Sequence, residues 1–215
     1  MAKHSAKTKD GWQHEAGRGV IAVDGTTKAK IERAALSLFM VRGVDGVSIK
    51  ELAAHAGISD GAMYRYYPSK YNLAHTLMLA IHNRLTKLVR EVDSGDDNFK
   101  AKIKNLVTNY CAAADDDWQL FSYHLLHLHH FPELFTKGPT KRKKLDSPVT
   151  ACADMLESAM KAGDIPNGNT ELLASMALGV VIQGASAKSY GRLSGPLSIY
   201  APEFERAIWA IVKQK

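Results

Sequence analysis

Apolar residues recur at intervals of three and four from residue 27 to the end of the chain, the spacing that puts them on one face of a helix. No segment shows the alternation of apolar and polar residues that is typical of a half-buried strand. The pattern therefore predicts an all-α protein. We expect nine helices: one from Thr27, two around residues 48–67, one from Ser69 to about Val92, and five more over residues 100–114, 115–135, 147–163, 170–192 and from Ala201 onward.

The second and third of these helices are joined by a tight turn. Ser48 and Glu51 have the spacing of a capping box, which predicts a helix that begins at Ser48. Gly57 follows that helix where a left-handed turn residue is needed. The spacing of Ala53, Gly57 and Ile58 is typical of a helix-turn-helix motif. The second helix of such a motif can enter the major groove of DNA.

With the helix before it, this motif resembles the TetR (tetracycline-repressor-like) family of transcriptional regulators. The residues that carry the resemblance are Leu38, Phe39, Gly43, Val47, Ser48, Leu52, Ala53, Ala56, Gly57, Ile58, Ser59, Gly61, Met63, Tyr64, Tyr66, Tyr67, Ser69, Lys70 and Leu73. Tyr66 replaces the usual His, Tyr67 the usual Phe and Tyr71 the usual acidic residue. The resemblance implies a two-domain architecture, with an N-terminal three-helix helix-turn-helix DNA-binding domain and a C-terminal helical ligand-binding and dimerisation domain.

The chain is expected to divide into three parts. Residues 1–26 are polar, contain glycine and lack periodicity, which predicts a disordered basic arm. That arm either adds only polar surface or reaches the DNA backbone or minor groove. Residues 27–72 form the expected DNA-binding domain, and residues 73–215 form the expected ligand-binding and dimerisation domain. The long helix from Ser69 bridges the two.

The formal net charge of +6 is unevenly distributed. Residues 28–71 carry a net charge of +3, and a basic loop at 137–144 holds five Lys and Arg residues. Outside that loop the C-terminal part is net negative. A basic end on a mildly acidic body is suited to binding a polyanion such as double-stranded DNA. The basic loop is interpreted as a solvated surface, with a further DNA contact as the alternative.

Five residues are expected to contact DNA phosphates. The resemblance implies this role for Tyr64, Tyr66 and Lys70, whose side chains can donate hydrogen bonds. Lys28 adds a cation near the start of the first helix. Ser48 lies at a helix N-terminus, where backbone N–H groups favour anions, although capping alone also explains it. Phosphate contacts fix the register of a protein on DNA and carry no sequence information directly.

The helix capped by Ser59 is expected to contact bases. Asp60 is placed to accept a hydrogen bond from cytosine N4, Ala62 to touch a thymine methyl group, and Arg65 to donate to guanine O6 and N7. For Arg65, a backbone contact or a solvated surface position explains the residue equally well. Gly61 lets the helix approach DNA closely. One such helix contacts only a few base pairs, so we expect a homodimer on a palindromic operator.

The last two predicted helices have apolar stripes with helical spacing, and the first of them has small residues that permit close packing. The resemblance implies that they pair with their copies in a second subunit as a four-helix dimer bundle. Packing inside one subunit is the alternative. The residues expected at the dimer interface are Gly179, Val180, Gln183, Ala187, Phe204, Ile208 and Ile211.

The predicted helix over residues 115–135 is apolar nearly all round, which indicates a central buried helix. An unknown small-molecule effector is expected to bind in a cavity there, and the candidate residues are Trp118, Phe121, His124, Met155, Met176 and Gln183. The histidines at 124, 127, 129 and 130 point in different directions around this helix. They are therefore predicted to be core or pocket groups, and no metal or other cofactor is expected.

Two other function classes stay open. A metal- or histidine-dependent enzyme would use His124–His130 and Asp115–Asp117, but no nucleophile, base and orienting group occur together. A ligand-independent DNA-binding protein would bind without any effector response. The interpretation adopted is a transcriptional regulator that is not an enzyme, most simply a repressor that a small molecule releases from its operator.

Cys111 and Cys152 lie in apolar helical patterns and are predicted to be buried, reduced thiols, because neither has the CxxC partner of a redox sensor. The longest apolar run, Met176–Ile182 with Gly179 inside it, is short for a membrane span. The N-terminus lacks the apolar segment of a secretory signal. A cytoplasmic protein without a membrane partner is expected.

Overall fold

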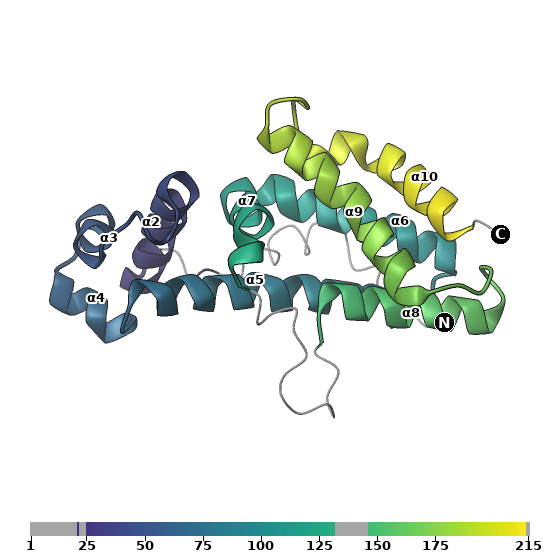
Figure 1. Ribbon diagram of the computed structural model, residues 1–215, viewed down its shortest axis with the longest axis horizontal. Helices are drawn as coiled ribbons and strands as arrows, with labels where there is room; N and C mark the ends of the chain where they lie inside the picture. The colour runs from purple at the N-terminus through teal and green to yellow at the C-terminus, as the bar shows by residue number, and fades with distance from the viewer. Residues whose placement is uncertain (1–20, 22–24, 132–145, 214–215) are drawn as a thin grey trace, which may run out of the picture.

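The computed structural model describes Ile21, residues 25–131 and residues 146–213. Within these ranges the chain forms nine α-helices and two short 3-10 helices, which confirms the predicted all-α fold. The helices are arranged along α5, which is drawn horizontally in Figure 1. The predicted basic loop at 137–144 lies outside the described residues, and so does most of the predicted arm at 1–26.

Three helices gather at one end of α5 (Figure 1). They are α2 (Thr27–Arg42), α3 (Ile49–Ala56) and α4 (Asp60–Tyr66), and α5 itself spans Lys70–Asp93. Serines cap the last three as predicted, but the cap of α2 is Thr26 rather than Thr27. The Thr26 hydroxyl accepts a hydrogen bond from the N–H of Ala29 at 3.1 Å, which fixes the start of the helix.

The remaining helices pack along the other part of α5 (Figure 1). They are α6 (Phe99–Asp116), α7 (Trp118–His127), α8 (Pro148–Ala162), α9 (Thr170–Ser189) and α10 (Ala201–Val212), with 3-10 helices at Leu128–His130 and Leu197–Tyr200. α9 therefore ends before the predicted Arg192. A left-handed Gly191, with φ of 70°, follows this end.

The prediction of one helix over residues 115–135 is wrong. α6 runs into this range, and α7 begins anew because the Asp117 carboxylate accepts a hydrogen bond from the N–H of Leu120 at 3.1 Å. α7 ends at His127. The chain cannot continue as a regular helix through Phe131, because that residue precedes a proline and the proline ring disfavours helical geometry before it.

Two clusters of buried residues run along the molecule. The first packs α2, α3 and α4 against the first half of α5 and includes Leu52, Met63 and Leu77. It also takes in Leu120 and Tyr123, so α7 closes the core of the helix-turn-helix end. The second cluster packs the rest of α5 with α6, α8, α9 and α10. Because α5 contributes to both clusters, its position links the two ends of the molecule.

Candidate functional site

The turn between α3 and α4 is held by backbone hydrogen bonds. Gly57 adopts φ 68° and ψ 37°, the left-handed conformation predicted for it. The N–H of Ile58 donates to the carbonyl of Ala53 at 3.0 Å, and that of Gly57 donates to the carbonyl of Ala54 at 3.1 Å. Met63 on α4 is fully buried. α4 therefore has a fixed orientation on α3, as a helix presented to DNA requires.

Ser48 and Glu51 form the predicted capping box at the start of α3. Ser48 Oγ accepts from the N–H of Glu51 at 3.2 Å, and the Glu51 carboxylate accepts from both the N–H and the hydroxyl of Ser48 at 2.8 Å. The Arg42 guanidinium, 2.8 Å away, and the Ser48 donors hold the pKa of Glu51 at about 2, below its ordinary value. Any phosphate contact by the Ser48 side chain has to compete with Glu51.

A surface groove brings several of the predicted DNA contacts together. It is lined by Ser48, Ile49, Lys50, Asp60, Tyr64, Pro68, Ser69, Lys70 and Tyr71. Tyr64 and Tyr66 project from α4 with 56% and 44% of their surface exposed. Lys50 and Tyr71 were not among the predicted contacts. The signal that could have indicated Lys50 is a basic residue in the first turn of α3, beside the cap.

Two of the predicted phosphate contacts also bond within the subunit. Lys70 Nζ donates to the carbonyls of Asp45 and Val47, both at 2.9 Å, and so holds the loop between α2 and α3. Lys28 Nζ lies 3.8 Å from the carboxylate of Glu32. A lysine ammonium has three donors, so both contacts are compatible with an additional phosphate.

The predicted base contacts lie together on α4. Asp60, Gly61 and Arg65 are exposed, and Ala62 is half-buried. The Ser59 hydroxyl caps this helix by accepting from the N–H of Ala62 at 3.2 Å. A Cβ atom built on Gly61 would meet no heavy atom within 4 Å, so packing inside the subunit does not require glycine there. The contacts of these residues with bases stay predictions.

Two departures from the family pattern have a structural explanation. The Tyr67 hydroxyl donates to the buried carboxylate of Glu32 at 2.6 Å, and burial together with this contact raises the pKa of Tyr67. The Tyr71 hydroxyl donates to Asp45 at 2.8 Å. Phenylalanine at position 67 would leave the Glu32 carboxylate with one partner fewer.

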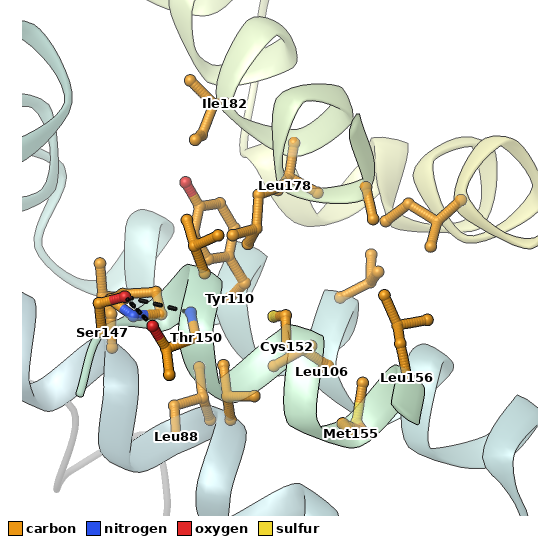
Figure 2. Close-up of a pocket in the computed structure, with 18 of the residues that line it drawn as sticks. Leu88, Leu106, Tyr110, Ser147, Thr150, Cys152, Met155, Leu156, Leu178 and Ile182 are labelled. Carbon is orange, nitrogen blue, oxygen red and sulfur yellow. Dashed lines mark hydrogen bonds between the residues drawn. The ribbon is translucent and has the colours of Figure 1, made fainter. Parts of the chain in front are cut away.

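A cavity of about 740 Å³ lies in the C-terminal half of the molecule, between α5, α6, α7, α8, α9 and α10. Its wall is mostly aliphatic, and Figure 2 shows Leu88, Leu106, Leu156 and Leu178 around the space. Concave, largely apolar sites of this size with a few polar groups are typical of small-molecule binding.

Only part of the predicted ligand site faces this cavity. His124 and Met155 line it. The predicted residues outside the lining are Trp118, Phe121, Met176 and Gln183. Trp118 stacks on Phe121 with ring centroids 6.0 Å apart, and Phe121 packs edge-on against Tyr110 at 4.8 Å, so Tyr110 faces the cavity in their place. The other two residues lie on the exposed face of α9.

His82 of α5 and His124 of α7 form a polar pair in the cavity wall. Nε2 of His124 lies 3.5 Å from Nδ1 of His82. Burial and, next to it, the neighbouring His82 lower the pKa of His124 to about 3, and burial lowers the pKa of His82. Burial raises the pKa of Cys152, in the same wall, and of buried Cys111 to about 12. All four groups are therefore uncharged near neutral pH, and the predicted burial of both thiols is confirmed.

The polar lining residues that sequence reasoning missed are His82, Tyr110, Ser147, Thr150 and Glu171. Tyr110 follows buried Val107 by one helical turn, and His82 follows buried Met78 in the same way. A polar group on the buried face of a helix is the signal that could have indicated both.

Comparison with known proteins decides the family. The family described as "Bacterial regulatory proteins, tetR family" matches residues 31–77. An uncharacterized HTH-type transcriptional regulator of Mycobacterium tuberculosis is 29% identical over 154 residues, which are 71% of this chain and 76% of that protein. Residues 31–77 match this family, so the resemblance found in the sequence is confirmed. The protein is a DNA-binding transcriptional regulator, as predicted.

Solved structures share the fold of this protein. A tetR-family regulatory protein from Rhodococcus RHA1 gives a TM-score of 0.70 at 20% identity, covering 89% of this chain and 99% of its own. FadR of Bacillus subtilis, solved in complex with stearoyl-CoA, gives a TM-score of 0.67 at 15% identity. The match covers 83% of this chain and 96% of FadR. The fatty acid degradation regulator FadR of Bacillus halodurans gives 0.66 at 15% identity, with 86% and 96% covered.

Two residues of the predicted dimer interface pack mainly inside their own subunit. Phe204 is buried against Gly184, where an added Cβ atom would overlap the phenyl ring, and Ile208 lines the cavity. Both side chains are buried in their own subunit, and their contact with a second subunit stays a prediction. The other predicted interface residues, which are at least partly exposed, are Gly179, Val180, Gln183, Ala187 and Ile211.

α9 has one exposed apolar face. Leu172, Met176 and Ile182 are large apolar side chains at its surface. By length and composition alone, α9 is the one helix in the described part of the chain that could cross a membrane. The sequence prediction considered only unbroken apolar runs and did not identify this helix. α9 also packs against α8 and α10. An exposed apolar patch on a packed helix is typical of a protein contact surface.

The histidines near α7 do not converge on a metal site. In the described ranges, no three His, Cys, Asp or Glu residues are placed to hold an ion. His124 faces the cavity, whereas His127 and His129 lie against His130 with ring centroids 6.0 and 3.9 Å away. Asp115, a candidate of the enzyme hypothesis, accepts hydrogen bonds from backbone N–H groups at the second 3-10 helix.

Proposed function

We propose that this TetR-family regulator is a homodimeric repressor that binds a palindromic operator and leaves it when an apolar small molecule enters the cavity. The observation that carries the ligand response is that one helix, α5, belongs both to the cavity wall and to the helix-turn-helix core. The rest of the proposal follows from the family and from the exposed surfaces.

α5 supplies a physical link for the response. Lys70 in its first turn holds the loop between α2 and α3, and Leu88 and Val89 near its other end line the cavity. A ligand that favours a different packing of these residues would change the spacing of the two recognition helices in a dimer. It acts only through its different affinities for the two spacings.

The proposed division of the chain is a DNA-binding domain over 27–72 and a ligand-binding and dimerisation domain over 73–215. The proposed DNA contacts are Lys28, Ser48, Ser59, Asp60, Gly61, Ala62, Tyr64, Arg65, Tyr66 and Lys70. Most of them lie on α4 or along the groove beside it, and Lys28 is exposed on α2, which supports this assignment. A protein with this role acts in the cytoplasm, where its operator lies.

The outer face of α9 is the proposed dimer interface. Its exposed apolar side chains, with the partly exposed Gly179, Val180 and Ala187, give a surface that two copies can share about a twofold axis. Dimerisation places two short recognition helices on two half-sites, and α4 alone is only seven residues long.

The ligand class proposed for testing is a fatty-acid derivative. Structural neighbours of this chain include regulators named for fatty acid degradation, and one of them was solved with stearoyl-CoA. The mostly aliphatic wall of the cavity supports an alkyl ligand, because burying such a chain gains about 0.8 kcal/mol per methylene group.

The test begins with selection of bound sequences from a random duplex pool by the purified full-length protein. We expect a palindromic consensus sequence. Light scattering should give the mass of one protein dimer bound to one duplex. Fatty acyl esters should then release the duplex. The control is the variant Ala177→Trp, in which the added indole fills the cavity from α9. This variant should bind DNA without responding to the esters. Enrichment of no sequence would contradict the proposal.

A further inference from the structure

The hydroxyl of Tyr110 is an unusual group in the cavity. Tyr110 projects from α6, and its ring is held edge-on by Phe121 with centroids 4.8 Å apart. Figure 2 shows the hydroxyl on the side of the ring toward Ile182 of α9. No described residue makes a hydrogen bond with it, whereas the hydroxyls of Ser147 and Thr150 bond each other at 3.0 Å.

The Tyr110 hydroxyl is placed to bond a ligand in the cavity. Tyr110 is half-buried, and its rigid ring holds the hydroxyl beside a space large enough for a ligand. Tyrosine keeps its proton here, since burial raises the pKa of Tyr110. The hydroxyl is therefore a hydrogen-bond donor, and it favours an acceptor oxygen on the ligand.

The charges around the cavity restrict what that acceptor can be. Among the described lining residues there is no lysine or arginine, and Glu171 is the one residue with a formal charge at neutral pH. His82 and His124 stay neutral because burial lowers the pKa of each. A carboxylate placed here would lose its hydration without gaining a cation from these described residues.

We infer that the cavity selects an uncharged carbonyl compound with a long alkyl body, an ester, thioester or ketone, whose oxygen accepts from Tyr110, and that it excludes the matching free carboxylate. This inference rests on the proposed function and specifies the ligand of the same site. The alkyl body lies along the aliphatic wall that includes Leu106, Leu156 and Leu178.

The test compares three probes that share one chain length: methyl dodecanoate, dodecanoate and dodecane. Each displaces a bound fluorescent naphthylamine dye from the full-length protein near neutral pH, below its aggregation limit. The ester should bind at least about tenfold more tightly than the ionised acid, because the acid has to bury its charge. Methyl undecyl ketone should match the ester, since both offer one carbonyl oxygen.

The variant Tyr110→Phe removes only the hydroxyl. It should weaken the ester by about five- to thirtyfold and leave dodecane unchanged, because only the carbonyl loses a partner. Tyr190→Phe, the same change at an exposed residue near the end of α9, should alter neither the ester affinity nor the dodecane affinity. Equal binding of ester and acid, or an unchanged ester affinity in Tyr110→Phe, would overturn the inference, and so would a failure of all the probes to displace the dye.

The outcome separates this inference from the proposed function. If the ester binds with this selectivity but leaves the operator bound, the cavity assignment holds and the ligand-released repressor is wrong. If a palindromic operator is found but the ester does not bind, the DNA-binding regulator stands and the neutral-carbonyl site is wrong.

Discussion

The Arg33 guanidinium of α2 lies 2.6 Å from the carboxylate of Asp117, the residue that caps α7. Gln119 on the same helix donates to the Ser37 hydroxyl of α2 at 2.9 Å. Further along α7, His124 lines the cavity. α7 therefore forms a second connection between the cavity and the helix-turn-helix, beside the one made by α5.

Removing the Arg33–Asp117 pair should weaken the ligand response more than DNA binding itself. Arg33 is partly exposed, so Arg33→Gln should cost no more than about 1 kcal/mol of unfolding free energy. The ratio of operator affinities without and with ligand should fall several-fold, because one of two links is lost. Fluorescence anisotropy of labelled operator measures both affinities.

The control for this variant is Lys161→Gln, which removes an exposed ion pair with Glu157 on α8. It should leave the affinity ratio unchanged. If Arg33→Gln also keeps the full ratio, α5 alone carries the response and the second connection is wrong.

The helix-turn-helix could be predicted because its determinants lie close together in the sequence. The capping pair Ser48 and Glu51 are three residues apart, and the left-handed Gly57 needs only its own backbone conformation. The long α5 followed from one cap at Ser69 and a sustained apolar stripe. The caps and the turn each act over a single turn, and the stripe of α5 repeats at a regular interval, so these elements follow from local sequence pattern.

The cavity could be predicted only in part, because its wall comes from six different helices. Helical periodicity identified Trp118 and Phe121 as buried, but it does not specify which neighbour covers them. In the structure Tyr110 lies between Phe121 and the cavity. In the same way, periodicity assigned Phe204 and Ile208 to an apolar stripe without deciding whether a second subunit or their own covers it.

Tyr67 should be more stabilising than the phenylalanine that is usual at its position. Its hydroxyl donates to buried Glu32 at 2.6 Å, so Tyr67→Phe removes one partner from a carboxylate that stays buried. We expect a loss of about 1–3 kcal/mol in the free energy of unfolding, measured by urea denaturation. Tyr66→Phe, at the exposed neighbouring residue, should change it by less than about 0.5 kcal/mol.

A second substitution tests the cause of that loss. Replacing Glu32 with leucine as well removes the carboxylate that has lost the Tyr67 hydroxyl, so the double variant with Glu32→Leu and Tyr67→Phe should be less destabilised than the sum of the two single variants. Strict additivity would show that the hydrogen bond is not the source of the effect.

Glu51 should make the helix-turn-helix sensitive to acid. Its carboxyl pKa is about 2 in the folded protein against an ordinary value of 4.5, so the unfolded state binds more protons below pH 4.5. The stabilisation is therefore fully present above that pH and is lost as the pH falls toward 2. Glu51→Gln should flatten this part of the curve of melting temperature against pH. In the Glu51→Gln background, Ser48→Ala should not further change how the melting temperature depends on pH in acid. A further change would show that another group causes part of this pH dependence.

The exposed face of α9 should hold two subunits together. Met176→Lys combined with Gln183→Lys places two cations on that face without touching the subunit core, since both residues are exposed. In a twofold interface each cation also faces its copy, so the dimer should dissociate and affinity for a palindromic operator should fall steeply. Light scattering reports the mass. Lys161→Glu on the surface of α8 is the charge-changing control, and a Met176/Gln183 variant that remains dimeric would place the interface elsewhere.

Arg65 should determine sequence preference rather than general affinity. It is exposed on α4, where an arginine can donate two hydrogen bonds to guanine. Arg65→Ala should cost about 1–3 kcal/mol on the preferred operator and relax selectivity at one position of each half-site, because a base contact distinguishes one base pair. Tyr64→Phe, which removes a proposed phosphate contact from the same helix, should weaken binding to all sequences about equally.

Repeating the duplex selection with each variant separates these outcomes. If the consensus is unchanged in Arg65→Ala and in matching variants of Asp60 and Ala62, α4 does not read bases through these residues, and the specificity comes from the shape of the DNA instead.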